Sequence, residues 1–366
     1  MHKFSRLIEA SLSLPSPSLE SASVLIYGAG NKGREVARVL TQRGHVIAGF
    51  LDTYAQTGQR VDNIPVTTMD DNKYPPNYSV IIAIHNHTAE IPMLQNAIRE
   101  KGFEQVLNVV ELYNTLPGVL PDHYWLTSRN AYRAFGAALD RLDGILADEP
   151  SRHWLEATLR FRLTGDYAVL PDPRFDQYRP NDLPAWPNPL RLIDCGAFNG
   201  DSLKHLAKGG YDFASIAAFE PDAKNFCQLV RESEYYENIV CFPCALGSQT
   251  EVLRLSAMAN TASHISSTGT QHVQCVTLDE VLPSFAPNLI KMDIEGAELE
   301  ALRGAYRLIS RHRPGLAISV YHTPGHLWQI PLLLHDWNLG YRFYLRGHAH
   351  NSFELVLYAL PAGLAA

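Results

Sequence analysis

The feature that most constrains this 366-residue chain is a pattern of strand, glycine turn, helix and strand that occurs twice. The first copy begins with an apolar run at 24–27 and ends with a second run at 46–51, followed by Asp52. Between the runs lie a helical pattern and three glycines with G-x-G-x-x-G spacing, namely Gly28, Gly30 and Gly33. Strands that alternate with helices build parallel sheets. The sequence therefore predicts an α/β fold.

The first copy has the arrangement of a nucleotide site. Glycines let the backbone approach a pyrophosphate, amides at the start of a helix bind it, and an acid after the second strand accepts hydrogen bonds from ribose hydroxyls. The three glycines and Asp52 are therefore a candidate site for NAD or for a nucleotide sugar. The alternative is a tight turn in a domain that has lost its ligand. Further apolar runs at 79–84 and 106–110 extend this doubly wound, Rossmann-like unit over 21–118.

The second copy differs in the spacing of its glycines. Its first strand ends at Asp194, Gly196 and Gly200 shape the turn, and its second strand ends at Glu220. The predicted strands of this unit span 190–193, 215–219, 239–243, 288–292, 316–321, 341–345 and 354–360. Polar residues cluster where several of these strands end, which is the edge where open parallel sheets bind ligands. The last two strands are predicted to pair as an antiparallel hairpin at the sheet edge.

The two copies and the segments around them predict four consecutive parts. Residues 1–20 end in a Pro- and Ser-rich stretch, which indicates an N-terminal tail or a short helix with a linker. The parts that follow are a Rossmann-like domain over 21–118, a helical connector with a proline-rich loop over 119–188, and a larger α/β domain over 189–366. Each of the two domains is long enough to bury its own core.

Charge, hydropathy and cysteine content exclude several classes of protein. The net charge is −7 without a block of basic residues, so nucleic acid is not a predicted partner. No apolar run approaches the length of a membrane span, so no membrane insertion is predicted. Five cysteines, an odd number, argue against a disulfide framework and favour a reducing, cytoplasmic location. Cys241 and Cys244 form a C-x-x-C without a second pair at metal-binding spacing, so no metal site is predicted. The oligomeric state stays open.

A series of motifs after about residue 140 points to a family. The motifs are IDCGAFNGDS, AAFEPDAKNF, CALGS, VTLDEVL, KMDIEGAELE and SVYHTP. In their order and approximate spacing they resemble the FkbM family of S-adenosylmethionine-dependent methyltransferases. The resemblance implies a class I methyltransferase fold, a seven-stranded and mostly parallel sheet with an antiparallel edge hairpin. It also implies methyl transfer to a hydroxyl of a carbohydrate or natural-product acceptor, with no clear metal requirement.

The resemblance also implies which residues bind the cofactor. Those expected at its methionine end are Asp194, Gly196, Ala197, Gly200, Asp201 and Ser202. Glu220 is expected to bind the ribose diol, and Ala245 and Leu246 are expected beside the adenine. Tyr178, in the connector, is expected to cover the cofactor. For Asp201 and Ser202, the alternative role is capping of the following helix.

Methyl transfer to an alcohol requires an aligned nucleophile, exclusion of water, and a group that takes the hydroxyl proton. Asp293 and His322, which follow two neighbouring strands, are alternative candidates for the general base, and Glu295 is expected to position the acceptor hydroxyl. The alternative is structural, with Glu298 placed against a helix dipole and His322 an ordinary strand-end histidine. His326 stands where bacterial sequences of this type often carry an acid, so no acceptor contact is predicted there.

Two alternative functions use the first domain instead. One is an NAD-dependent oxidoreductase or sugar-modifying enzyme, although no Tyr-x-x-x-Lys pair completes a dehydrogenase site. The other is a non-enzymatic module that binds a nucleotide or nucleotide sugar. It is suggested by GAG-x-x-G and GFLD, which resemble the N-terminal domains of some sugar acetyltransferases.

Overall fold

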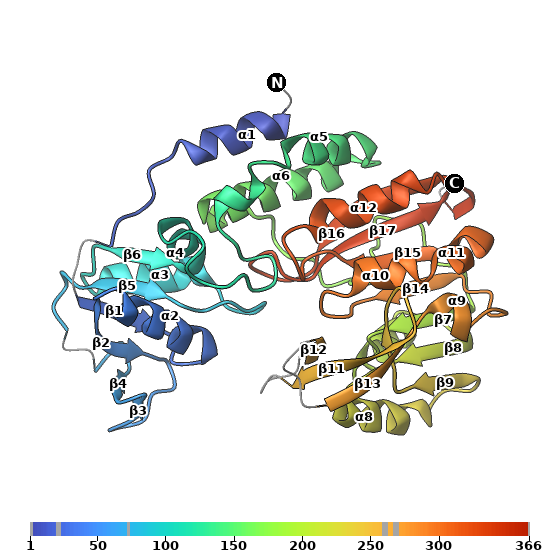
Figure 1. Ribbon diagram of the computed structural model, residues 1–366, viewed down its shortest axis with the longest axis horizontal. Coiled ribbons are helices and arrows are strands. Elements are labelled where there is room, and N and C mark those ends of the chain that lie inside the picture. The colour runs from blue at the N-terminus through green and yellow to red at the C-terminus, as the bar shows by residue number, and fades with distance from the viewer. Residues whose placement is uncertain (1–2, 20–22, 72–73, 258–262, 266–270, 365–366) are drawn as a thin grey trace. The chain divides into compact units, whose positions relative to one another are not determined.

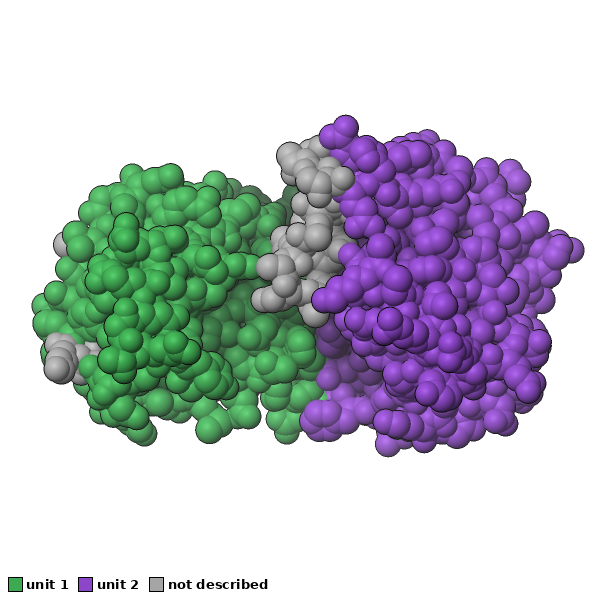
Figure 2. Space-filling view, turned by 90° about the horizontal axis from the view of Figure 1, so that it is seen from below, with its two compact units in different colours: residues 1–143, 153–173, 349–353 green, residues 144–152, 174–348, 354–366 purple. Residues whose placement is uncertain are grey.

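The chain divides into two compact units, each discontinuous in sequence (Figures 1 and 2). The computed structural model describes residues 3–19, 23–71, 74–257, 263–265 and 271–364. Unit 1 comprises residues 1–143, 153–173 and 349–353, and unit 2 comprises residues 144–152, 174–348 and 354–366. The predicted parts are consecutive, whereas the observed units are interleaved. The predicted connector is divided between them.

Unit 1 contains the first glycine turn and a six-stranded sheet in the order β3-β4-β2-β1-β5-β6. Its strands are β1 Ser23–Tyr27, β2 Val46–Leu51, β3 Arg60–Val61, β4 Ile64–Thr67, β5 Ser79–Ile82 and β6 Val106–Asn108. Neighbouring strands are parallel except β3 with β4. The predicted Rossmann-like domain is confirmed. The sequence does not predict the β3–β4 hairpin, because strands this short do not show a clear alternation.

Along the chain, the helices of unit 1 precede, separate and follow its strands. They are α1 Lys3–Leu12, α2 Asn31–Gln42, α3 Ile91–Glu100 and α4 Val109–Thr115, with short 3-10 turns at Arg129–Tyr132 and Tyr167–Val169. Two further helices, α5 Gly136–Ile145 and α6 Glu149–Thr164, each contain residues of both units. None of the helices that the structure describes combines the length and the apolar content needed to span a bilayer.

The N-terminal segment, predicted as a tail or a short helix, contains a helix that packs within unit 1. Phe4 and Ile8 lie four residues apart on one face of α1, and both side chains are buried. The carboxylate of Asp140 accepts a hydrogen bond from the Phe4 amide at 2.8 Å. An acidic group at the start of a helix satisfies an amide that has no partner within the helix. Of the two alternatives predicted for residues 1–20, the structure shows the short helix, whose apolar residues have helical spacing.

Unit 2 contains a seven-stranded sheet in the order β16-β17-β15-β14-β7-β8-β9. Its strands are β7 Leu190–Cys195, β8 Phe213–Phe219, β9 Ile239–Phe242, β14 Leu289–Met292, β15 Gly315–Ser319, β16 Tyr341–Gly347 and β17 Leu355–Pro361. The pairs from β9 to β15 are parallel, and β17 is antiparallel to both of its neighbours. The predicted class I methyltransferase sheet is confirmed, including the antiparallel hairpin at its edge.

A second sheet of four strands follows β9 and has the order β10-β13-β11-β12. Its strands are β10 Ala245–Leu246, β11 Glu251–Ala257, β12 Ser263–Ile265 and β13 Gln271–Val276. The seven predicted strands do not include these. The helices of unit 2 are α7 Asp201–Lys208, α8 Ala223–Ser233, α9 Leu278–Val281, α10 Glu298–Arg303, α11 Tyr306–His312 and α12 His326–Asp336, with a 3-10 turn at Ala362–Leu364.

Residues from the predicted connector hold β16 and β17 in place. Arg346 on β16 is buried, and its guanidinium pairs with Asp148 at 2.6 Å and with Asp182 at 3.0 Å. The Tyr178 amide donates a hydrogen bond to the Tyr358 hydroxyl on β17 at 2.9 Å. A buried charge requires such partners, because an unpaired charge in the interior is costly. These connector residues are therefore part of unit 2.

Candidate active site

A cavity of about 480 Å³ lies in unit 2 where β7, β8, β14 and β15 end. The strand order reverses at this point, because β8 lies on one side of β7 and β14 lies on the other. Open α/β sheets bind ligands in the crevice outside such a reversal. Part of the wall comes from Gln177 and Tyr178, which belong to the predicted connector, and part from Glu354, which precedes β17. The volume is within the range of small-molecule sites.

The glycine turn after β7 brings the backbone close to β14. Gly196 has a φ of +78°, and a β-carbon at this position would collide with the carbonyl oxygen of Asp293. Gly200, with a φ of +83°, stands at the start of α7. A side chain at Gly196 would therefore both strain the backbone and push the turn away from the end of β14.

Glu220 holds this turn from the end of β8. Its carboxylate accepts hydrogen bonds from the amides of Phe198 at 3.0 Å and Asp222 at 2.8 Å. The side chain lines the cavity, yet the residue is only 6% exposed. Burial raises the pKa of Glu220 to about 7, although the two amides act in the opposite direction. Each carboxylate oxygen can accept more than one hydrogen bond, so Glu220 can still bind the hydroxyls of a ligand.

The residues expected to bind the cofactor fall into two groups. Those that line the cavity are Tyr178, Gly196, Asp201, Ser202, Glu220, Ala245 and Leu246. The lining that the structure describes does not include Asp194, Ala197 or Gly200, and a cofactor contact at these three stays a prediction. Asp194 is fully buried, accepts a hydrogen bond from the Ser202 hydroxyl and pairs with Lys291 at 3.1 Å. Asp194 thus supports the wall from behind.

Lys291 is a functional candidate that the sequence analysis missed. It sits within β14 between apolar neighbours, and its ammonium group donates to the Gly196 carbonyl at 2.5 Å. Burial lowers the pKa of Lys291, but the carboxylates of Asp194, Asp293 and Asp201 outweigh burial and raise it above its usual range. Lys291 therefore stays charged and ties the glycine turn to β14. A lysine inside an apolar run is the signal that could have identified it.

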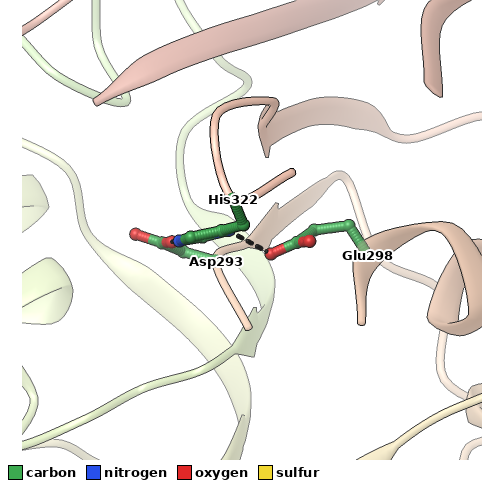
Figure 3. A group of neighbouring side chains, drawn as sticks. All are labelled: Asp293, Glu298 and His322. Atoms are coloured by element: carbon green, nitrogen blue, oxygen red, sulfur yellow. Dashed lines mark hydrogen bonds and ion pairs between the residues drawn. The ribbon is translucent and has the colours of Figure 1, made fainter. Parts of the chain in front are cut away.

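The predicted catalytic residues meet at the end of β14, where Figure 3 shows His322 between Asp293 and Glu298. The Nε2 atom of His322 lies 3.3 Å from Asp293 and 3.6 Å from Glu295, and its Nδ1 atom lies 2.7 Å from Glu298. The Asp293 carboxylate also accepts a hydrogen bond from the Tyr178 hydroxyl at 2.9 Å. Asp293 and Glu295 line the cavity.

His322 differs from Asp293 in protonation and in access. Burial lowers the pKa of His322, but Glu298 and the carboxylates of Asp293 and Glu295 raise it to about 10. The imidazole is therefore charged at neutral pH and has no vacant nitrogen to take a proton. Its side chain is 1% exposed, and His322 is not among the described residues that line the cavity. These observations argue against His322 as the general base and make it a positioning residue for Asp293.

Glu298 anchors this arrangement from the start of α10. Its carboxylate accepts hydrogen bonds from the amides of Ile294 at 2.9 Å and Gly296 at 3.4 Å. Its second oxygen lies 3.1 Å from Nδ1 of His326. Burial raises the pKa of Glu298, but His322 and His326 outweigh burial and lower it. His326, for which the sequence predicted no acceptor contact, thus contacts Glu298.

The ligand atoms of Asp293, Glu298 and His322 lie within 4.8 Å of one another, which is close enough to consider a metal ion. Glu298, however, already contacts two amides and two imidazoles, and Asp293 contacts the Tyr178 hydroxyl. A cation would also have to displace the proton that His322 presents to Glu298. We interpret the group as a polar chain from Tyr178 through Asp293 and His322 to Glu298 and assign no metal to it.

Glu354 is the second residue that the sequence analysis missed. It lines the cavity, and its carboxylate accepts hydrogen bonds from the Gln177 amide group at 2.7 Å and the Tyr321 hydroxyl at 3.0 Å. Sequence reasoning placed it as the first residue of the last strand, where an acid has no special meaning. Its contacts depend on two distant segments, so only the folded chain reveals them.

The candidate nucleotide site in unit 1 has a similar backbone arrangement. Gly28 has a φ of +101°, and a β-carbon at Gly33 would collide with the carbonyl oxygen of Gly28. Gly30 precedes α2 as its N-cap. The carboxylate of Asp52 accepts hydrogen bonds from the amides of Ala29 and Tyr54, both at 3.0 Å. The predicted residues are thus brought together, and whether they bind a ligand stays a prediction.

Among solved structures, this chain is similar to the methyltransferase FkbM from Methylobacillus flagellatus KT. The two are 23% identical, the match covers 97% of this chain and 98% of that chain, and the TM-score is 0.79. This likeness establishes the fold. The fibrillarin of Aeropyrum pernix, solved with bound S-adenosyl-L-methionine, is 12% identical over 47% of this chain and 67% of its own, at a TM-score of 0.30. That value is too low to carry an argument. No curated protein matches the sequence.

Two family models cover separate parts of the chain. Residues 194–343 match the methyltransferase FkbM domain, and residues 23–106 match the PglD N-terminal domain. The first match contains the glycine turn after β7, Glu220 and the Asp293 group, and the second contains the glycine turn after β1. The chain therefore contains a methyltransferase FkbM domain at residues 194–343 and a PglD N-terminal domain at residues 23–106.

Proposed function

We propose that this protein transfers a methyl group from S-adenosylmethionine to a hydroxyl of a neutral carbohydrate or natural-product acceptor. The observation that carries the proposal is Glu220, a buried carboxylate that lines a cavity of about 480 Å³ at the strand reversal. A carboxylate at the end of the second strand is placed to accept hydrogen bonds from two ribose hydroxyls. Its burial removes water that would compete for those bonds.

The lining of the cavity fits the cofactor from end to end. S-adenosylmethionine supplies a methyl group on a positively charged sulfur. We assign Gly196, Asp201 and Ser202 to its methionine end, and Ala245 and Leu246 to the adenine, where apolar contact suffices. Carboxylates elsewhere in the cavity attract a cationic ligand. Glycine at position 196 lets the turn pack directly against the Asp293 carbonyl oxygen, which holds the turn at the cavity.

The charges around the cavity favour a neutral acceptor. Asp293, Glu295 and Glu354 line it, and the cation Lys291 is already engaged by Asp194 and the Gly196 carbonyl. A phosphate or carboxylate on the acceptor would meet like charges in a poorly solvated site. Hydroxyl groups, in contrast, can donate to carboxylates. We assign Asp293 and Glu295 to binding and orienting the acceptor hydroxyls.

The proposal is tested in two steps with the purified full-length protein. S-adenosylhomocysteine, the product form of the cofactor, is first added at about 100 times its dissociation constant. It is expected to raise the melting temperature by about 5 °C or more, because ligand binding at that excess stabilises the folded state by about 2.7 kcal/mol. S-adenosylmethionine is then incubated with the protein and a panel of neutral methyl glycosides and hydroxylated small molecules, and S-adenosylhomocysteine formation is measured.

Each step can overturn a different part of the proposal. No thermal shift at millimolar cofactor would exclude the assigned cofactor. A thermal shift without turnover on any neutral member of the panel would reject the acceptor class. Turnover only on phosphorylated or carboxylated glycosides, added as a second panel, would reverse the charge argument made from Asp293, Glu295 and Glu354.

A further inference from the structure

We propose that Glu354 is the general base of the reaction, the group that takes the proton of the acceptor hydroxyl during methyl transfer. This inference rests on the proposed function and deepens it. Glu354 lies outside the matched FkbM domain, which ends at residue 343. Its carboxylate nevertheless lines the same cavity as Glu220 and Asp293.

The contacts of Glu354 hold its carboxylate without neutralising it. The hydroxyl of Tyr321, after β15, donates to one oxygen at 3.0 Å, and the side-chain amide of Gln177 donates to the other at 2.7 Å. Both donors are uncharged groups. Each carboxylate oxygen keeps capacity for another hydrogen bond, so the carboxylate can receive one from an acceptor hydroxyl. The two contacts fix the orientation that proton transfer requires.

The other carboxylates of the cavity are less suited to take a proton. Asp293 faces the charged imidazole of His322 at 3.3 Å and the hydroxyl of Tyr178 at 2.9 Å, and a neighbouring cation stabilises the charged form of an acid. Glu220 is bound by two backbone amides at the opposite, ribose-binding position. Glu295 likewise lies 3.6 Å from the imidazole of His322, and Asp201 accepts a hydrogen bond from the Ser202 amide at the start of α7. The side chains that donate hydrogen bonds to Glu354 are, in contrast, both neutral.

The electrostatic surroundings of Glu354 also favour its role as a base, because they raise the pKa of its carboxyl group. Burial and the negative charge of Asp293 raise the pKa of Glu354 to about 7, although Gln177, His322 and Tyr321 act against them. Tyr178 is the other titratable group that interacts with Glu354. A general base is most effective when its pKa lies near the working pH. The geometry and the protonation state thus agree.

The backbone at Glu354 supports a constrained role as well. Its φ is +48°, in the left-handed region that side chains other than glycine rarely adopt. Such a conformation is strained for a residue with a side chain and persists where the surroundings enforce it, often at functional sites. The conformation is consistent with a side chain that must point into the cavity in one orientation.

The step that follows from this placement is a direct displacement. A lone pair of the acceptor oxygen forms a bond to the methyl carbon, and the bond between that carbon and the sulfur breaks. The electron pair of the broken bond stays on sulfur, which becomes a neutral thioether. The hydroxyl proton moves to the Glu354 carboxylate and later to water. Charge and atoms balance without any further reactant.

The decisive variant is Glu354→Gln in the full-length protein. With the neutral methyl glycoside that the wild type methylates best, kcat is expected to fall about 100-fold or more, since general-base catalysis contributes about 10²–10⁴. The dissociation constant for S-adenosylhomocysteine, measured by calorimetry, is expected to stay within about twofold. Glu280→Gln, which alters an exposed carboxylate on α9, is the matched control and is expected to behave as wild type.

A second variant tests the hydrogen bond that the Tyr321 hydroxyl donates to the proposed base, Glu354. Tyr321→Phe removes a hydrogen bond that favours the charged form of Glu354, so the pKa of Glu354 should rise. The acidic limb of the kcat/KM profile is expected to move to higher pH, with kcat near its plateau reduced less than about tenfold. A purely structural role of Tyr321 would lower the plateau without moving that limb.

The outcomes separate this inference from the proposed function. A wild type that makes no S-adenosylhomocysteine with any acceptor overturns the proposed function and this inference together. An active wild type with Glu354→Gln retaining more than a tenth of kcat overturns the role of Glu354 alone. If Glu354→Gln lost cofactor affinity, the unshifted pH limb of Tyr321→Phe would still reject the inference.

Discussion

In both units, the acid that follows the second strand holds a glycine turn through two backbone amides. Asp52, after β2, accepts from the amides of Ala29 and Tyr54, and Glu220, after β8, accepts from the amides of Phe198 and Asp222. In each case one amide belongs to the turn and the other lies two residues after the acid. The backbone of the two sites is therefore built in the same way.

The two sites differ in what surrounds the acid. Asp52 is partly exposed, whereas Glu220 is buried and lines a cavity that distant segments help to enclose. A hydroxyl that binds an exposed carboxylate only replaces water, so the net gain is small. In a site that excludes water, the same bond contributes more. The comparison indicates that a glycine turn becomes a strong ligand site only when other parts of the chain enclose it.

The largest expected effect comes from removing each acid in turn. Glu220→Ala is expected to weaken S-adenosylhomocysteine binding about 100-fold or more, because two hydrogen bonds to a buried charge are lost. Asp52→Ala is the matched control and is expected to leave that affinity unchanged. Isothermal titration calorimetry measures both. An equal loss in the two variants would break the distinction between the sites.

A smaller effect is expected from pH. The pKa of Glu220 is raised to about 7 by burial, and a ribose diol donates to its charged form. Below that pH a proton must leave before the ligand binds, so affinity for S-adenosylhomocysteine is expected to fall about tenfold between pH 8 and pH 6. Glu220→Gln has no such proton and should show a flatter profile. A wild-type profile that matches the variant would contradict the assigned role.

The smallest effect is expected from a nucleotide ligand at the first turn. NADH fluorescence is expected to show no saturable change below about millimolar concentration, because hydroxyls at the partly exposed Asp52 compete with water. A saturable change that Asp52→Ala abolishes would instead revive the NAD-dependent alternative and make the two turns equivalent. The same titration with a nucleotide sugar, followed by calorimetry, examines the other ligand that the sequence leaves open.

Much of the fold could be predicted because its signals are local. Apolar runs, glycine turns and helical patterns predicted both parallel sheets and the antiparallel edge hairpin of unit 2. The four-stranded sheet of β10 to β13 was missed, because pairing between short strands depends on distant partners. The interleaving of the units was missed for the same reason. Nothing in the sequence of 349–353 indicates that it packs with unit 1.

The candidate site shows the same division between local and distant signals. Glu220 and Asp293 follow strands directly, so their place at the sheet edge could be expected. Lys291 and Glu354 could not, since their roles come from contacts with Asp194, Gln177 and Tyr321. The protonation state of His322, one of the two base candidates, could not be predicted from the sequence. It depends on the carboxylate of Glu298, which only the folded chain places beside the imidazole.

The pairing of Arg346 with Asp148 and Asp182 determines where this protein can be cut. A fragment that begins at the predicted domain boundary, residue 189, would lack both aspartates and leave a buried guanidinium without a carboxylate. Loss of such partners costs about 3–5 kcal/mol, a large share of the stability of a typical domain. Such a fragment would retain the entire family match and still be expected to unfold. The shortest fragment expected to fold on its own therefore has to start before Asp148, well ahead of the matched FkbM domain at residues 194–343.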